Sequence, residues 1–208
     1  MTHEYRPTQR ELQDRFDTRR LADRLAVGSG DRISPEHRRF VEARDMVFVA
    51  TVDDTGQPTC SYKGGDPGFV RVVDETTIAL PVYDGNGMFL TTGNLLAHPS
   101  VGLLFVDFET GTRLRVHGTA SLDAEDPLLA SFAGAIMVMR IRAGSVFANC
   151  RRYVHHYEKV DRSPFVPDGH HEPPVPDWKR DPWFEGTLPA DDPALDPDHP
   201  SAPSIPQY

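Results

Sequence analysis

Residues 50–81 read ATVDDTGQPTCSYKGGDPGFVRVVDETTIALP. Short runs rich in Val, Thr, Ile and Phe alternate here with clusters of Asp, Gly and Thr, a pattern typical of strands joined by tight turns. The cluster Asp53–Gly56 predicts one hairpin, and Asp74–Thr76 predicts a second. The paired strands are expected at 46–52 with 57–62, and at 69–73 with 77–82. This region is therefore predicted to be an antiparallel sheet.

The alternation of strand-forming runs and turn residues continues after residue 81. The stretch RLRVHGTAS, residues 113–121, alternates regularly between polar residues and apolar or small ones. It is predicted to pair with 101–108 across a turn at 109–111, and later strands are expected at 135–143 and 153–160. Three hairpins with additional strands indicate a small closed or sandwiched sheet, and hence a mainly β (α+β) fold.

Helices are predicted before and between the strands. Residues 8–26 contain good helix formers and no Gly or Pro. The apolar pairs Leu12/Phe16 and Leu21/Leu25 fall on opposite faces of such a helix. Either the helix breaks between the two pairs, or it packs against other residues on two sides. Ser34-Pro35 suits the start of a helix that ends near Arg44. Further helices are expected at 88–97 and, more briefly, at 126–132.

Composition divides the chain into three parts. Residues 1–44 are expected to form an N-terminal helical extension, 45–160 the β domain, and 161–208 an acidic tail with 12 of the 19 prolines. Such a tail cannot build its own core, but its Phe and Trp residues favour contact with a folded surface. We expect residues 161–188 to pack on the domain and residues 189–208 to be largely disordered.

Several classes of function are disfavoured by charge and composition. The formal net charge of −9 argues against binding to nucleic acid or to an anionic membrane. No apolar run approaches the ~18 residues of a membrane span, and the polar N-terminus lacks a signal-peptide core. The two cysteines show no zinc-finger spacing. Adjacent His155 and His156 on a strand would point to opposite faces, so no metal site is predicted. We expect a soluble, cytoplasmic protein.

The segment YDGNGMFLTTGN, residues 83–94, carries the strongest chemical signal. A strand ends, two glycines free the backbone, and a helix begins with hydroxyl-bearing residues in its first turns. N–H groups at such a helix start favour a bound phosphate. A dinucleotide fingerprint is absent, because its third glycine would fall at Leu90, and there is no P-loop. A plain turn with a helix cap fits the same residues.

Two other segments are candidates for the same site. CSYKGGDPG, residues 60–68, leads from a strand into a glycine-rich loop in which Lys63 could pair with a phosphate. A wide hairpin loop with a solvated lysine is the alternative. In FANCRRYVHH, residues 147–156, Asn149, Arg151 and Arg152 could clamp an anion or the edge of a flavin, or could simply begin a polar strand.

The order of these features resembles the flavin-binding split barrels related to pyridoxamine 5′-phosphate oxidase. The resemblance spans roughly residues 40–160. It rests on the segment 50–81, on YDGNGMFLTTGNLLAHPSVGLLFVDF at 83–108, and on RLRVHGTA at 113–120. It extends to NCRRYVH and to PVPDWKRDPW in the tail, which are similar to the branch of the family described only as flavin-binding.

The resemblance implies an FMN-binding split β-barrel with N-terminal helices and a proline-rich C-terminal tail. In that family a set of strand residues and a basic residue hold the flavin phosphate, and the next helix start completes the pocket. The matching positions are Ser61, Tyr62, Lys63, Tyr83, Asn86, Thr91 and Thr92. The oxidases proper carry an Arg-Lys pair at the helix start, where this chain has Leu90 and Thr91, and their pyridoxal phosphate-reading C-terminal segment has no clear counterpart.

The resemblance therefore implies flavin binding more strongly than it implies the oxidation of pyridoxamine 5′-phosphate. The sequence predicts FMN rather than FAD, a homodimer, and a flavin-dependent oxidoreductase that acts on an unidentified small molecule. No catalytic residue is assigned. The alternatives are a non-catalytic flavin-, deazaflavin- or haem-binding module, and an interaction protein without a cofactor.

Overall fold

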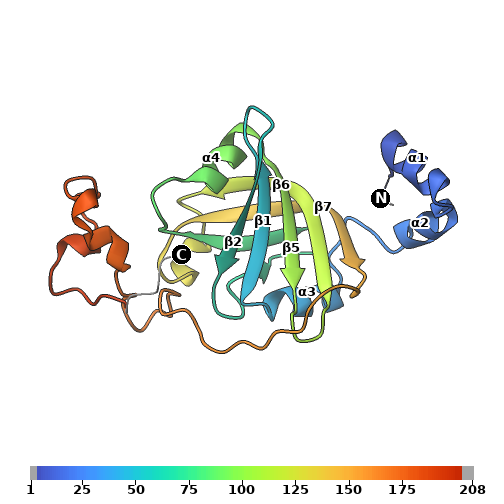
Figure 1. Cartoon of the computed structure of the whole chain (residues 1–208). Coiled ribbons are helices and arrows are strands. Elements are labelled where there is room, and N and C mark those ends of the chain that lie inside the picture. The colour runs from blue at the N-terminus through green and yellow to red at the C-terminus, as the bar shows by residue number, and fades with distance from the viewer. Residues whose placement is uncertain (1–3, 203–208) are drawn as a thin grey trace. The chain divides into compact units, whose positions relative to one another are not determined.

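The computed structural model describes residues 4–202 and divides the chain into two compact units, Met1–Glu158 and Lys159–Tyr208. Among the described residues, the first unit contains the strands and the α-helices (Figure 1). Over residues 159–202 the second unit contains three short 3-10 helices. No helix within residues 4–202 combines the length and apolar character needed to cross a membrane.

The centre of the first unit is a single antiparallel sheet in the order β2-β1-β5-β6-β7-β4-β3. Its strands are β1 Met46–Val52, β2 Pro58–Gly64, β3 Arg71–Val72, β4 Thr77–Tyr83, β5 Ser100–Val106, β6 Arg113–Asp123 and β7 Ala135–Asn149. The sheet curves around its buried face (Figure 1). The predicted mainly β, split-barrel architecture is confirmed.

The predicted hairpins form where the turn residues lie. Between β1 and β2, the Asp53 carboxylate accepts hydrogen bonds from the backbone N–H groups of Thr55 and Gln57, at 2.9 and 2.8 Å. Between β3 and β4, the Asp74 carboxylate accepts one from the N–H of Thr76 at 2.7 Å. The aspartate side chain at the first position of each turn thus accepts hydrogen bonds from backbone N–H groups for which the turn provides no backbone carbonyl.

The two longest strands, β6 and β7, pair irregularly at one point. The pairing of β6 with β7 shifts register between His117 and Gly118, which marks a β-bulge. A Cβ atom on Gly118 would collide with the carbonyl oxygen of Arg142 and would lie 3.0 Å from its carbonyl carbon. Glycine is therefore required where the two backbones approach most closely, and the bulge bends the sheet around its core.

The core follows the alternation of the strands. Val47 and Val49 of β1, Leu103 and Phe105 of β5, and Val116 of β6 are all essentially inaccessible to solvent. They belong to one hydrophobic cluster on the concave side of the sheet. Burial of this apolar surface provides the main driving force for closing the sheet.

The helices partly match the prediction. The region 8–26 breaks into α1 Pro7–Arg15 and α2 Arg19–Ala26, with Asp17 in a left-handed conformation (φ 51°) between them. Helix α3, Pro35–Glu42, begins as expected, because the Ser34 hydroxyl accepts a hydrogen bond from the His37 N–H at 3.1 Å. Helix α4, Leu90–Ala97, packs against β1 and β6.

Two elements predicted after β6 were wrong: one is shorter than expected and the other does not form. The expected helix at 126–132 is only one 3-10 turn, η1 Leu129–Ser131. The strand expected at 153–160 does not form. Instead β7 continues to Asn149, because it pairs with β6 along the full length of that strand. Residues after β7 cover the β5–β6 turn, where the Tyr157 N–H donates to the Phe108 carbonyl at 3.2 Å and the two rings meet edge to face.

The second unit has its own small set of contacts. Lys179, in the 3-10 helix η2 Asp177–Arg180, forms a buried ion pair with Asp192 at 2.7 Å. Nearby, the Phe184 ring of η3, Pro182–Phe184, contacts Trp178 and Trp183 edge to face. The third 3-10 helix, η4 Pro193–Leu195, begins at the Asp192 cap. Residues 203–208, part of the segment expected to be disordered, lie outside the described residues.

Candidate functional site

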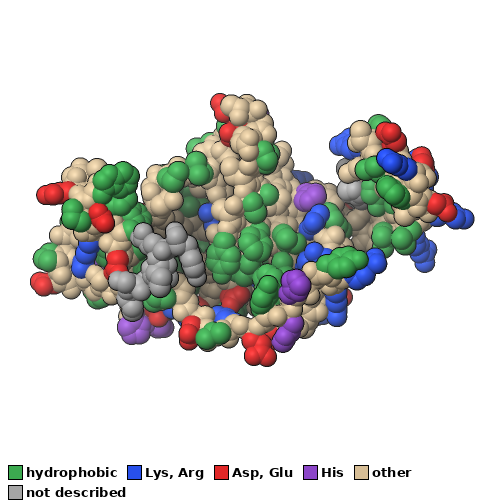
Figure 2. Space-filling view, viewed as in Figure 1, with side chains coloured by type: hydrophobic (Ala, Val, Ile, Leu, Met, Phe, Trp, Pro, Cys, Tyr) green, Lys and Arg blue, Asp and Glu red, His purple; other side chains and the backbone are tan. Residues whose placement is uncertain are grey.

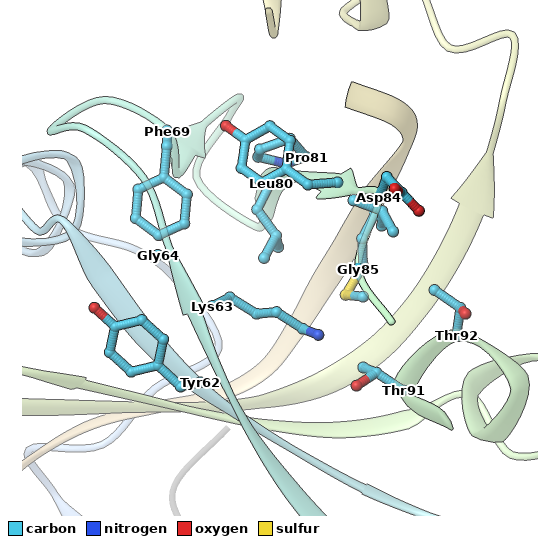
Figure 3. A pocket seen from close by; sticks show the side chains of 13 residues that line it. Tyr62, Lys63, Gly64, Phe69, Leu80, Pro81, Asp84, Gly85, Thr91 and Thr92 are labelled. Atoms are coloured by element: carbon cyan, nitrogen blue, oxygen red, sulfur yellow. The ribbon is translucent and has the colours of Figure 1, made fainter. Parts of the chain in front are cut away.

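A cavity of about 230 Å³ lies between β2, β4 and the start of α4. Residues from these three elements meet here, as Figure 3 shows. Its lining combines two tyrosines, one lysine, one aspartate and two threonines with apolar side chains and two glycines: Tyr62, Lys63, Gly64, Phe69, Leu80, Pro81, Val82, Tyr83, Asp84, Gly85, Thr91, Thr92 and Met139.

Lys63 provides the positive charge of this lining. Its side chain extends across the cavity towards the start of α4, whereas the Tyr62 ring points the opposite way, as expected for neighbours on a strand (Figure 3). Lys63 is half-buried, and loss of hydration lowers the pKa of its ammonium group. A desolvated cation of this kind favours an anionic ligand.

The turn before α4 positions the opposite wall. The Asn86 side chain accepts a hydrogen bond from the Met88 N–H at 3.1 Å, Gly87 has a positive φ of 74°, and Phe89 is left-handed with φ 49°. The helix then begins at Leu90. N–H groups in the first turn of a helix have no intrahelical partner, so this end of α4 is suited to an anion.

Two buried threonines lie at that helix start. The Thr91 hydroxyl is 2.9 Å from the Ser61 hydroxyl on β2, and the Thr92 hydroxyl donates to the Phe89 carbonyl at 3.1 Å. Both side chains are less than 10% exposed, at 8% for Thr91 and 6% for Thr92. Hydroxyls, helix N–H groups and the Lys63 ammonium therefore converge on one polar side of the cavity.

The other side is apolar. Leu80, Pro81 and Val82 of β4 line it together with Met139 of β7 and Phe69 of the loop before β3. Sequence reasoning did not single these residues out. The apolar run of β4 was the available signal, but it is equally typical of an ordinary core strand. One polar and one apolar wall suit a ligand with a charged end and a flat, apolar end.

Residues predicted for the site fall into three groups. Ser61 reaches the cavity edge through Thr91, while Tyr62, Lys63, Tyr83, Thr91 and Thr92 line it. Asn86 is exposed and shapes the turn before α4. The remaining three predicted residues, Asn149, Arg151 and Arg152, are not in the lining.

Asn149 to Arg152 lie at the end of β7, beside the β5–β6 turn, where the Arg151 Cβ atom is 3.7 Å from the position of a Cβ on Gly111. Arg151 and Arg152 are exposed. The backbone N–H and guanidinium of Arg152 lower the pKa of the exposed Cys150 thiol. Within residues 4–202 there is no group of three or more His, Cys, Asp or Glu side chains arranged to hold a metal ion.

A scan against protein-family models matches residues 33–160, more than half of the chain, to the family described as pyridoxamine 5′-phosphate oxidase. A search of curated proteins finds no match.

The chain is also similar to several solved structures. HupZ from Group A Streptococcus is 21% identical, with a TM-score of 0.47, and the match covers 61% of this chain and 99% of that one. HutZ, the haem storage protein from Vibrio cholerae, is 20% identical with a TM-score of 0.43, and the match covers 56% and 95% of the two chains. An F420 reductase is 16% identical with a TM-score of 0.37, covering 54% and 93%.

Proposed function

The chain belongs to the pyridoxamine 5′-phosphate oxidase family, and we propose that it is a flavin-dependent oxidoreductase that holds FMN in the cavity between β2, β4 and α4. The observation that carries this proposal is the convergence of Lys63 with the start of α4. A half-buried ammonium group, two buried hydroxyls and a helix N-terminus meet at one end of a cavity whose other wall is apolar.

Each group has a definable task in that arrangement. Lys63 and the first-turn N–H groups of α4 would hold the phosphate, and Ser61 and Thr91 would orient it. The apolar wall around Leu80 and Met139 would exclude water from the flat ring. Bound FMN would supply the redox chemistry, while the protein supplies position and electrostatics.

FMN is favoured over FAD because the site offers one phosphate-binding end. The helix start is not preceded by a dinucleotide fingerprint, and the cavity, at about 230 Å³, is smaller than the roughly 300–1,000 Å³ of most ligand pockets. Part of a flavin would extend beyond this cavity, so the rest of the site has to come from elsewhere.

A second copy of the chain is the proposed source. The outer face of β2, β1 and β5 is apolar, with Tyr62, Phe48 and Leu104 in one row across the three strands and Cys60, Ala50 and Gly102 in the next. Figure 2 shows hydrophobic side chains gathered over these strands. Tyr62, 61% exposed, lies on this face and also at the cavity. A copy seated here would lie beside the cavity and could bring Asn149 to Arg152 to it.

Haem is less well supported than flavin. None of the described residues that line the cavity is a histidine, and a histidine is a frequent axial ligand of haem iron. The substrate is proposed to be a small molecule stacked on the flavin. Leu90 and Thr91, which replace the Arg-Lys pair of the oxidases proper, argue against pyridoxamine phosphate chemistry.

A visible spectrum of the purified protein, followed by heat release and chromatography of the bound molecule, tests the cofactor. Bands near roughly 375 and 450 nm and recovery of FMN are expected, since both are properties of the flavin. Recovery of FAD alone, or a Soret band, would contradict the proposal. Turnover of the bound flavin with NADPH would then separate an oxidoreductase from a non-catalytic carrier.

A further inference from the structure

A row of polar side chains runs along the contact between β2 and α4. Thr59, Ser61 and Lys63 are spaced two apart, so they project from one face of β2. Thr91 and Asn94 are three apart and share one face of α4. The two rows meet pairwise. The Ser61 and Thr91 hydroxyls are 2.9 Å apart, and the Asn94 amide donates to the Thr59 hydroxyl at 3.3 Å.

Asn94 also bridges to a second strand. Its amide nitrogen donates to the hydroxyl of Thr51 on β1 at 3.1 Å, and the Thr51 and Thr59 hydroxyls are themselves 2.9 Å apart. Thr51 is only 2% exposed. One side-chain amide therefore joins α4 to two neighbouring strands in a buried, mutually hydrogen-bonded group. Such networks specify one arrangement, whereas an apolar contact would tolerate sliding of the helix.

Lys63 continues the β2 row beyond Ser61. Helix α4 begins at Leu90, one residue before Thr91. The polar row on the helix therefore ends at Thr91, whereas the polar row on β2 continues for one more residue, Lys63. The cavity lies at that place. The distance between Lys63 and the first-turn N–H groups thus depends on how α4 is seated on β2, and that seating is held by the Thr59–Asn94 and Ser61–Thr91 contacts.

We propose that Asn94 is a positioning residue of the cofactor site: through Thr51 and Thr59 it fixes α4 on the sheet so that the helix start and Lys63 bind the same phosphate. This inference rests on the function proposed above. Asn94 itself is not in the cavity lining, so it acts only through the helix.

The test compares Asn94→Ala with wild type, first without ligand. Alanine is the better helix former, and Thr51 and Thr59 remain bonded to each other, so α4 and the barrel should still form. Hydrogen exchange should show faster exchange of amides in residues 93–98, which lie in or directly after α4, with unchanged protection in β7. Leu96→Ala, on the same helix with a side chain 78% exposed, is the matched control.

The second measurement is an FMN titration of the ligand-free proteins, followed by circular dichroism of the bound flavin at saturation. Asn94→Ala should raise the dissociation constant about tenfold, the effect of one to two lost hydrogen bonds, and should alter the flavin dichroism. Thr59→Val should shift both quantities in the same direction. Thr59→Ser keeps the hydroxyl but loses the methyl group and should bind FMN as wild type does, which would assign the effect of Thr59→Val to the lost hydrogen bonds and not to altered packing.

The outcomes are distinguishable. Faster exchange in α4 together with weaker FMN binding supports the inference. Unchanged exchange, or faster exchange with wild-type affinity and dichroism, overturns it. If wild type fails to bind FMN, the proposed function fails, and the exchange measurement alone still decides whether Asn94 holds the helix.

Discussion

Lys63 shows how one residue can link stability to binding. Its ammonium group is half-buried against apolar strands, and burial lowers its pKa because the charged form loses hydration. In the ligand-free protein this desolvation opposes folding. A phosphate placed beside the ammonium group would replace the lost water with a charge-assisted hydrogen bond. Lys63 is thus expected to lower the stability of the ligand-free protein and to contribute strongly to the affinity for a phosphate-bearing ligand.

The first prediction concerns affinity. Lys63→Ala should weaken FMN binding by roughly 1.5–3 kcal/mol, the value of a hydrogen bond to a charged group. Lys159→Ala removes the same charge from the second unit and should leave the affinity unchanged. Flavin fluorescence titrated against each ligand-free variant measures the difference. Equal dissociation constants for the two variants would remove Lys63 from the site.

The second prediction concerns stability and its pH dependence. Because the pKa of Lys63 is lowered from 10.5, the unfolded chain binds this proton more tightly than the folded protein. Stability should therefore rise with pH as the pH passes the lowered pKa and approaches 10.5. Lys63→Met should lack this rise and, at neutral pH, should be more stable without ligand by about 0.5 kcal/mol, a modest gain because solvent screens the half-exposed group.

Urea unfolding of the ligand-free proteins at pH 7 and between pH 9 and 10.5 measures both effects. Lys159→Met serves as the control for the loss of one positive charge. A Lys63→Met variant that is less stable than wild type at pH 7 would contradict the prediction.

At the scale of elements, a bulge in the pairing of β6 with β7, with Gly144 as the extra residue of β7, bends the sheet locally. It lies between His117 and Gly118, where the β7 backbone leaves no room for a Cβ atom. The bend lets one sheet bring both β2 and β4 to the cavity, although they lie at separate positions of the strand order. A residue far from the cavity therefore determines whether its two walls face each other.

The third prediction tests this role. Gly118→Ala should destabilise the protein by about 3 kcal/mol, because the methyl group would overlap the Arg142 carbonyl and force the two strands apart. Gly144→Ala is the matched control on β7, since its Cβ would meet the His117 carbonyl oxygen at an ordinary 3.7 Å. Chemical denaturation compares the two variants. A Gly118→Ala protein with wild-type stability would show that the bulge adjusts freely.

At the scale of the whole molecule, the outer face of the sheet is more apolar than expected for a surface that a single chain exposes to water. The strand MVFVATV, residues 46–52, is apolar at nearly every position, whereas a strand with one solvated face normally alternates. Its outward residues Phe48, Ala50 and Val52 form part of the apolar face over β2, β1 and β5. Large exposed patches of this kind mark interaction sites, and a two-fold copy is the commonest partner.

The fourth prediction is an obligate dimer that buries more than about 2,000 Å² in total. Light scattering at low micromolar concentration, with and without FMN, should give twice the mass of the chain. Ala50→Arg, in the middle of the apolar face, should give a monomer that also binds FMN more weakly, because the second half of the site is lost. Thr55→Arg, in the exposed β1–β2 turn, is the control.

Deletion of residues 161–208 should loosen the dimer or its flavin. Deletion of 189–208 should destabilise the second unit, because it leaves the buried Lys179 without Asp192. A stable, flavin-loaded monomer of the full chain would contradict both the assembly and the placement of Asn149 to Arg152 near the partner's flavin.

Features that depend on neighbouring residues could be predicted from the amino-acid sequence. Asp53 and Asp74 specify their turns, Ser34 caps its helix, and alternation predicts the strands from 46 to 121, because each depends on interactions within a few residues. Ser61, Lys63 and Thr91 could be grouped into one site because the family resemblance supplied long-range information. The match of residues 33–160 to the family confirms that resemblance.

The contacts between distant segments became visible in the folded structure. It extended β7 to Asn149 in place of a strand at 153–160, brought Leu80 and Met139 to the cavity, and joined Asn94 to Thr51 and Thr59. These contacts depend on strand register, on the bulge at Gly118 and on the seating of a helix. No local pattern encodes them, because an apolar or hydroxyl-bearing residue looks the same in sequence whichever partner the fold places beside it.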